Sequence, residues 1–472
     1  MSLAGFQFLA FTIAVYVIWR YLLSSDDSRR NFLLLASYYF YGTFDVRFAA
    51  VLALVTAVQW TIGGRIHAAQ SRQAKLHWLW VSVGAGLACL AYFKYAGFFL
   101  ESLSGMLQGL GISAYEPLLK IAAPIGISFY TFQSLTYTID IYRGKEKPTA
   151  SLRDFALFIA LFSHVTAGPI ARARHLLPQI SSPEFRSGRL DSEAVFLVVR
   201  GLFKKIVIAD VLAASFFTPA FGSPEQWSSW FLFVAVIAYT FQIYMDLSGY
   251  TDIARGTARC FGYDLAINFD RPYLARTVSS FWRRWHMSMS GFFREYLYWS
   301  IGGSKHGHVY TNLIVTFVAI GLWHGAGWNF VVYGLLHGSI VCLERVRRLR
   351  RRSLGLTDED ESSTGRLFGF AYTFLFVAFA RILFVAPDLN GALEFMRALW
   401  SSAGQGGAAG TQGYVTLLVA IALHALPLRV ETRARDLFFS QHVAIQGLFM
   451  AAFVFVLIAL AAESRAFVYF QF

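Results

Sequence analysis

The chain has 472 residues, 56% of them hydrophobic and 15% charged, and its mean hydropathy is +0.49. This composition excludes an ordinary soluble protein, in which charged residues make up about 25% of the chain. The formal net charge of +13 would indicate nucleic-acid binding in a soluble chain. In so apolar a chain, the excess of Lys and Arg on the cytoplasmic side of a membrane accounts for it. We therefore expect membrane lipids around the protein and no nucleic-acid partner.

Apolar segments of membrane-spanning length recur along the whole chain. A helix needs about 20 apolar residues to cross a hydrocarbon layer of about 30 Å. The first segment has no basic region before it and no convincing cleavage site, so we expect it to be retained. Some segments are short and one could cross twice, which predicts about eleven transmembrane helices, with re-entrant or interfacial ones, in one all-α polytopic domain covering 1–472. The candidate spans are 5–23, 33–62, 78–92, 118–139, 155–165, 195–214, 231–247, 313–323, 328–342, 368–385, 415–426 and 443–461.

Basic segments predict the orientation of the chain. ERVRRLRRR at 344–352 has six arginines in nine residues and opens a loop, 344–366, that we expect on the cytoplasmic side. RVETRARD at 429–436 follows two further candidate spans, which return the chain to the same side. Between those spans, SSAGQGGAAGTQG at 401–413 has the composition of a loop on the opposite side, where we also expect the C-terminus.

The segment GLWHGAGWNFVVYGLLHG at 321–338 lies in an apolar run, 310–342, that is too long for one span. As a single helix this run would extend about 50 Å at 1.5 Å per residue. HGAG at 324–327 is the natural break, and irregular backbone at membrane depth occurs only inside protein or along a wet cavity. The glycine pairs at 321/325 and 334/338 have the spacing that lets helices approach closely.

We expect this break to present His324 to an internal cavity, because an ionisable residue inside a membrane is a functional candidate by default. The alternative is a neutral histidine that only bonds a backbone carbonyl. Trp323 and Trp328 flank the break, and together with Asn329 they are candidates for the cavity wall. His337 lies 13 residues further on, about 220° around the axis of a continuous helix, and would then face elsewhere.

A second unusual segment is SFWRRWHMSMSGFFREYLYWSIGG at 280–303. Its aromatic and basic residues predict an amphipathic helix that lies in the interface or re-enters the membrane. Arg283, Arg284 and Arg294 would then lie at headgroup depth. Snorkelling explains these arginines but does not explain His286 in the middle of the segment.

Other polar residues interrupt the spans. In FQIYMDLSGYTDIARG at 241–256, Asp252 and Arg255 are three residues apart and could form an ion pair, which favours a structural role for this segment. Asp246 and Ser248 belong to the same segment. Gln133, in APIGISFYTFQSLTYTIDIYRGK at 123–145, is a candidate to line a path through the protein, and packing against other helices is the alternative.

Two basic pairs are candidates for a cytoplasmic entrance. Arg172 and Arg174, in HVTAGPIARARHLLPQI, suggest the wall of a vestibule. Lys204 and Lys205, in GLFKKIVIAD, either snorkel or attract an anion. The sequence has no GxSxG nucleophile elbow, P-loop, HExxH or dinucleotide fingerprint, so an enzyme of this kind would need no serine nucleophile and no metal.

Taken in order, these motifs resemble the membrane-bound O-acyltransferase family, and above all its bacterial branch of alginate O-acetylation and teichoic-acid D-alanylation membrane proteins. The resemblance covers about 30–345. It implies a ring of helices around a thin, funnel-bearing centre that holds the family's histidine, which is His324 of the WHG motif here. His286 occupies the place of a second polar residue in related chains.

The resemblance implies an O-acyltransferase, in which His324 is the general base and His286 orients it or supports the oxyanion. Acetyl-CoA is the expected co-substrate and no cofactor is bound. The acceptor would be an exported polysaccharide such as alginate, reached directly or through an SGNH-type acetyltransferase partner and the export machinery of a bacterial inner membrane. The expected donor-binding residues are Lys204, Lys205, Arg172, Arg174, Arg283 and Arg284, and the expected cavity-lining residues are Trp323, Trp328, Asn329, Gln133, Asp246 and Ser248.

Three alternatives stay open at the level of sequence. The same motifs serve D-alanyl transfer to teichoic acid. A transporter or flippase would bind its substrate at the same residues without acyl chemistry, although paired inverted halves are not visible. A scaffold for an export complex would need no chemistry at all.

Overall fold

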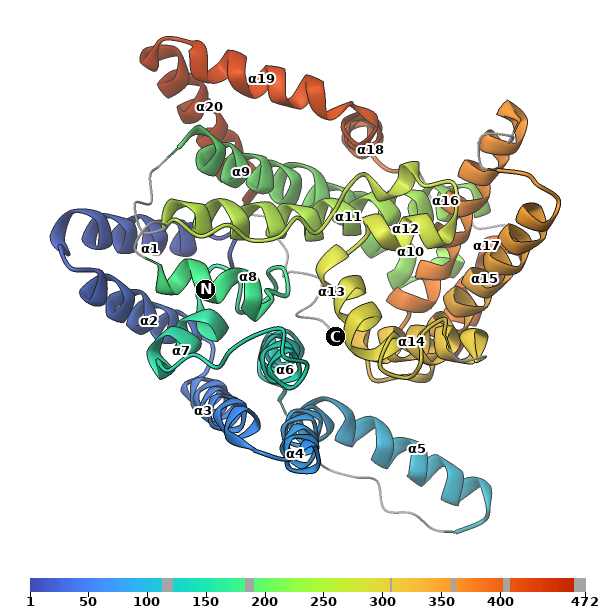
Figure 1. The fold of residues 1–472 in the computed structure, drawn as a ribbon. Helices are drawn as coiled ribbons and strands as arrows, with labels where there is room; N and C mark the ends of the chain where they lie inside the picture. The colour runs from blue at the N-terminus through green and yellow to red at the C-terminus, as the bar shows by residue number, and fades with distance from the viewer. Residues whose placement is uncertain (113–121, 183–190, 306–307, 358–361, 402–407, 462–472) are drawn as a thin grey trace. The chain divides into compact units, whose positions relative to one another are not determined.

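The structure is a computed structural model that describes residues 1–112, 122–182, 191–305, 308–357, 362–401 and 408–461. Every regular element in these ranges is a helix, which confirms the all-α class (Figure 1). Parts of several predicted features lie outside the described residues. They are the start of the span 118–139, the acidic part of the loop 344–366 and the centre of the loop 401–413.

The helices divide into two compact units. The first is Met1–Ala194 with Ala254–Ala266, and the second is Val195–Ile253 with Ile267–Phe472. The expectation of one domain over 1–472 stays a prediction. The helices of the first unit are α1 (Phe6–Val17), η1 (Ile18–Leu22), α2 (Asp26–Gly42), α3 (Val46–Ala68), α4 (Arg72–Leu90), η2 (Ala91–Tyr95), α5 (Ala96–Gly109), α6 (Ile127–Tyr142), α7 (Leu152–Ala160) and α8 (Ala173–Ser181).

Helix α6 forms the centre of the first unit. Nearly all of its side chains are buried, and α3, α4, α7 and α8 pack against it. Three buried polar side chains join three of these helices: the Ser82 hydroxyl donates to Gln59 Oε1 (2.6 Å) and bonds Thr138 Oγ1 (2.7 Å). Hydrogen bonds between helices add to van der Waals packing where lipid gives no hydrophobic drive for association.

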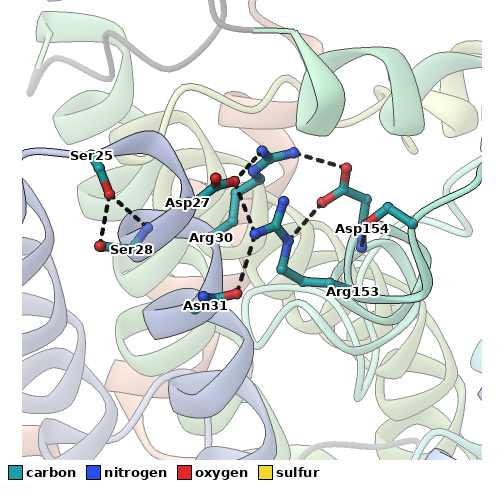
Figure 2. A network of polar contacts seen from close by, with 8 residues as sticks. Ser25, Asp27, Ser28, Arg30, Asn31, Arg153 and Asp154 are labelled. Atoms are coloured by element: carbon teal, nitrogen blue, oxygen red, sulfur yellow. Dashed lines mark hydrogen bonds and ion pairs between the residues drawn. The ribbon is translucent and has the colours of Figure 1, made fainter.

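An ionic network ties the start of α2 to the start of α7 (Figure 2). Arg30 bonds Asp154 (2.8 Å), and Arg153 bonds Asp27 (2.9 Å). Ser25 caps α2 by accepting a hydrogen bond from the backbone N–H of Ser28. The hydrogen bonds from Arg153 and Arg30 lower the pKa of Asp27, so this carboxylate keeps its charge in mildly acidic solution.

The second unit is longer and contains the two histidines that the sequence singled out. Most of α11 belongs to it, and the last residues of that helix belong to the first unit. Its helices are α9 (Ser192–Leu202), η4 (Phe203–Asp210), η5 (Ala213–Phe217), α10 (Thr218–Gly222), η6 (Pro224–Gln226), α11 (Ser229–Cys260), η7 (Pro272–Leu274), α12 (Val278–Arg284), α13 (Met287–Phe292), η8 (Phe293–Tyr298), α14 (Val309–His324), α15 (Trp328–Ser353), α16 (Ser363–Val385), α17 (Leu389–Ser401), α18 (Thr411–Ala425), α19 (Leu428–Ser440) and α20 (Val443–Ala461).

The predicted break at HGAG is confirmed. Helix α14 ends at His324, and α15 begins at Trp328 and packs along α14 as a hairpin. Glycines make this packing possible, because a Cβ on Gly321 would collide with the carbonyl oxygen of Phe330. A Cβ on Gly334 would likewise collide with the backbone of α14. The expected role of glycine in close helix approach therefore holds within this hairpin.

The prediction of one amphipathic helix at 280–303 is wrong. The segment forms α12, α13 and η8, and His286 between the first two has a left-handed backbone (φ 45°). The cause is pairing with another part of the chain. The backbone N–H of Met287 donates to Asn268 O (2.8 Å), and that of Asp270 donates to Arg284 O (2.9 Å). These bonds replace the helical ones that would otherwise pass through His286.

Two basic segments that were predicted as loops are helical. ERVRRLRRR continues α15 to Ser353, and RVETRARD belongs to α19, which turns by 101° from α18. Helix α19 carries exposed apolar residues among its arginines, and arginine is too costly in hydrocarbon for this helix to extend α18 into the membrane. An amphipathic helix along the surface satisfies both requirements.

Within the part of the chain that the structure describes, five helices are long and apolar enough to cross a membrane, or six if α18 and α19 count as one bent span. Two shorter apolar stretches, Phe6–Leu22 and Val309–His324, fall below that length. The expected count of about eleven is therefore not confirmed, because several predicted spans are broken. The segment 155–165, for example, supplies only part of α7, whereas the segment 33–62, which could cross twice, is divided between α2 and α3. The multi-pass membrane character itself agrees with these helices.

We predict that Gly321→Ala destabilises the protein, because the new methyl group meets backbone, which cannot turn aside as a side chain can. Overpacking of this kind costs about 1–3 kcal/mol. Thermal unfolding in detergent should show a lower midpoint. The matched control is Gly64→Ala in α3, where a Cβ has no neighbour within 4 Å and alanine favours the helix. A Gly321→Ala protein as stable as the wild type would contradict the close approach.

Candidate active site

His324 lies at the last residue of α14 and is only 2% exposed. Aromatic rings surround it: the centroid of Trp323 lies 4.8 Å away, that of Phe384 5.1 Å and that of Tyr333 6.2 Å. The break in the apolar run therefore places the imidazole inside protein. The hydrated passage that we expected to reach it stays a prediction.

His286 contacts the same tryptophan. The ring of Trp323 lies edge to face with His286 at 5.5 Å, and it also contacts His324. His286 is 2% exposed, and its left-handed backbone turns it from the path that a continuous helix would have followed. The fold therefore brings the two predicted catalytic histidines to one aromatic ring from segments 38 positions apart in sequence numbering (324 against 286).

His337 belongs to the same neighbourhood, which the sequence analysis did not expect. Its ring lies 4.4 Å from that of Tyr333, which also contacts His324. The expectation that it faces elsewhere assumed a continuous helix, and the break at the glycines removes that assumption. His337 accepts a hydrogen bond at Nδ1 from Trp282 Nε1 (3.2 Å), so this ring is fixed in place. Its spacing from Tyr333, one helical turn along α15, was the available signal.

Arg381 is a second residue that sequence reasoning missed. It is 3% exposed in α16 and donates to Thr240 O (3.1 Å) and to Tyr273 Oη (2.6 Å). Its guanidinium lies 4.5 Å from the ring centroid of Trp285, the residue before His286. An arginine inside an apolar span is a functional signal in its own right, and the sequence analysis passed over it.

The two other residues predicted to line the cavity beside His324 have different surroundings. Asn329 is buried and donates through Nδ2 to Leu383 O (3.1 Å) and Ala386 O (2.9 Å), so it ties the start of α15 to the end of α16. Trp328 is 57% exposed. The predicted place of both side chains in a cavity wall stays a prediction.

Lys205 lies in a buried ionic group with two carboxylates. Its ammonium contacts Asp210 (2.7 Å) and Asp246 (2.9 Å), and all three side chains are 4% exposed or less. Ser248, two residues after Asp246, is buried. The contact between Lys205 and Asp246 joins η4 to α11, and two carboxylates face the one ammonium.

The expected ion pair between Asp252 and Arg255 is wrong. Asp252 pairs with Arg200 (2.7 Å) and Lys204 (2.7 Å), whereas Arg255 donates to the carbonyl of Leu265 (3.0 Å). Asp252 faces the segment of α9 and η4 that runs beside α11, so two cations from another helix reach it. Contacts between helices decided this pairing, which spacing along one helix could not show.

Three predicted residues of the donor and cavity sets lie in the first unit. Gln133 donates to the carbonyl of Phe158 and bonds His164 (3.1 Å). Arg174 lies 4.0 Å from the carboxylate of Asp140, and Arg172 precedes α8. The candidate donor residues therefore belong to both units.

Arg283 and Arg284 lie in the second unit and line a cavity of about 510 Å³. Five more arginines share its wall, from the α12 region and the end of α15.

Among the described residues, no group of three His, Cys, Asp or Glu side chains could hold a metal ion.

A multi-pass helical protein with two buried histidines on one tryptophan has groups suited to proton transfer in a water-poor site. The comparison with known families gives the class. The sequence profile of the membrane-bound O-acyltransferase family matches residues 33–385. The chain belongs to this family and is an O-acyltransferase. The match runs further than the resemblance over 30–345 and includes α16, which carries Arg381.

Curated relatives narrow this class. The chain is 38% identical to the probable alginate O-acetylase of Azotobacter vinelandii over 387 residues, which cover 81% of this chain and 74% of the relative. It is 31% identical to the peptidoglycan O-acetyltransferase of Helicobacter pylori, over 84% of this chain and 78% of that protein. A teichoic acid D-alanyltransferase from Streptococcus thermophilus is 26% identical, over 55% of this chain and 68% of the relative.

We predict that Lys205→Met destabilises the protein strongly, because it leaves Asp210 and Asp246 buried without their cation. Removing one partner from a buried ionic group costs about 3–5 kcal/mol. The triple variant Lys205→Met, Asp210→Asn, Asp246→Asn should recover much of this loss, since no charge then stays buried. Thermal unfolding in detergent measures both. A triple variant no more stable than the single one would show that the ionic group is not the cause.

Proposed function

We propose that this protein transfers an acetyl group from cytoplasmic acetyl-CoA to an exported cell-envelope polysaccharide such as alginate. The contact of Trp323 with both His286 and His324 is the observation that carries this proposal, since it assembles the two residues with the proposed chemistry. The acetyl group is favoured over D-alanine because relatives named as O-acetylases share more identity over more of the chain than those named as D-alanyltransferases.

In the proposed reaction, His324 acts as the general base. An acceptor hydroxyl gives its proton to the imidazole while its oxygen attacks the thioester carbonyl carbon. The C–S bond of the resulting tetrahedral oxyanion then breaks, and the departing thiolate takes the proton from the imidazolium. These two steps conserve atoms and charge, and they need neither a metal nor a covalent enzyme intermediate. Because His324 is buried among aromatic rings, the transferred proton has few competing water molecules.

His286 supports the reaction through Trp323 or by a bond to the developing oxyanion. His337, held by Trp282, keeps Tyr333 against His324. The charge of Arg381 beside Trp285 favours a negative charge nearby, as an oxyanion would be.

The proposal places the protein in a bacterial inner membrane, with donor and acceptor on opposite sides. The acceptor hydroxyl belongs either to the polysaccharide or to a membrane-anchored or periplasmic SGNH-type acetyltransferase that passes the acetyl group on. The export machinery of the polysaccharide would then be a further partner. The relative from Helicobacter pylori, named for peptidoglycan, makes that polymer a second acceptor to test.

We predict that His324→Ala abolishes acetyl transfer from labelled acetyl-CoA by purified protein in detergent. Loss of a general base lowers rates by about 10²–10⁴-fold. His286→Ala should cause a smaller, graded loss, because it supports the reaction without taking the proton.

The matched control is His77→Ala, which changes an exposed histidine on α4 and should keep full activity. Equal activity of the wild type and His324→Ala would remove acyl transfer at this site. Labelled D-alanyl thioester in a parallel assay decides between acyl groups, and a preference for it would overturn the choice of acetyl.

A further inference from the structure

A cavity lined by arginines lies in the second unit, and neither His286 nor His324 is among its lining residues. Its volume is about 510 Å³, and its wall comes from the η7–α12 region, the last turns of α15 and the first turns of α16. We call it the arginine pocket. The guanidinium groups that line it belong to Arg276, Arg283, Arg284, Arg347, Arg348, Arg351 and Arg352.

One acidic side chain, Glu344, stands in the described wall, and it is already engaged. Its carboxylate accepts hydrogen bonds from the backbone N–H of Val278 (2.5 Å) and of Ser279 (2.9 Å), and from the Ser279 hydroxyl (2.6 Å). These bonds satisfy donors at the start of α12, where a negative charge is favoured. Glu344 therefore stabilises a helix terminus, and its single negative charge stands beside seven guanidinium groups in the wall.

The arginines repel one another. Burial and then the charge of Arg348 lower the pKa of Arg283. Glu344 raises this pKa in part, and Arg284 lowers it further. Within the described residues, no carboxylate lies within ion-pair distance of Arg283, Arg284 or Arg348. Holding several like charges around one cavity is unfavourable unless an anion enters it.

The pocket also has an apolar side at the start of a candidate membrane span. Phe368 and Tyr372, in the first turns of α16, line it, are 66% and 38% exposed, and stack on each other at 6.3 Å. Helix α16 is apolar and long enough to cross a membrane. Basic pockets beside the ends of membrane helices bind lipid headgroups, and exposed aromatic rings can also stack on a nucleotide base.

We propose that the arginine pocket binds a ligand that carries phosphate groups. Guanidinium groups bind phosphate through paired hydrogen bonds, and the volume is that of an ordinary small-ligand site. Two sources present phosphates at this level of a membrane protein. One is the nucleotide end of a CoA thioester, which rests on the proposed function, and the other is the headgroup of an anionic phospholipid, which does not.

The test removes two charges from the pocket with Arg348→Gln, Arg351→Gln. The control, Arg345→Gln, Arg350→Gln, removes the same charge from the same helix at positions outside the wall. Coenzyme A with a free thiol is the soluble probe, measured by equilibrium binding in neutral detergent. Phosphatidylglycerol is the lipid probe, measured as lipid retained by the protein from mixtures with phosphatidylcholine.

We expect the pocket variant to lose at least about tenfold in affinity for one probe, since hydrogen bonds between guanidinium and phosphate are stronger than those between neutral groups. The control should stay close to the wild type, and Arg348→Lys, Arg351→Lys should recover part of the loss. A loss confined to coenzyme A assigns the nucleotide source, and a loss confined to phosphatidylglycerol assigns the lipid. Unchanged binding of both probes, by a pocket variant that is monodisperse and unfolds at the wild-type temperature, overturns the proposal.

This outcome is separable from that of the proposed function. His324→Ala should lose acetyl transfer and still bind coenzyme A, because the pocket does not include His324. If no transfer is found in any variant but the pocket variant still loses binding, acyl transfer fails and the phosphate site stands.

Discussion

The backbones of α14 and α15 meet at Gly321 and Gly334 more closely than any other residue would allow, and the remaining site depends on that approach. The hairpin reverses the chain within three residues of His324, so that His324 of α14 contacts Tyr333 of α15. Trp323 then extends this cluster to His286, and Tyr333 extends it to His337. A methyl group at the crossing would separate both helices and, with them, the histidines.

Basic side chains have two kinds of surroundings in the second unit. Around α11, Lys204, Lys205 and Arg200 form ion pairs with carboxylates at short distance. At the end of α15 the arginines face a cavity, and Glu344 serves a helix terminus instead. Among the basic residues that were predicted to bind the donor, Arg283 and Arg284 therefore have the surroundings that suit an anion best.

Several features of the site could be predicted because their cause is local. The break before Trp328 follows from an apolar run too long for one span and from glycines within it. Resemblance then identified His324 and His286 as a pair. The left-handed backbone of His286 could not be predicted, because it depends on bonds between residues near 285 and those near 269, whose pairing has no periodic signature. The ion-pair partners of Asp252 could not be predicted for the same reason, because they come from another part of the chain.

The sequence by itself determined the apolar all-α class, the break in the 310–342 run, the family and its histidine, because composition, periodicity and motif order are properties of the chain. Only the tertiary structure decided which rings surround His324, that His337 and Arg381 join this neighbourhood, and that arginines from distant segments line one cavity. The physical reason is that burial and charge balance depend on distances between helices. Those distances are set by how side chains and glycines of different segments fit together, which no single segment specifies.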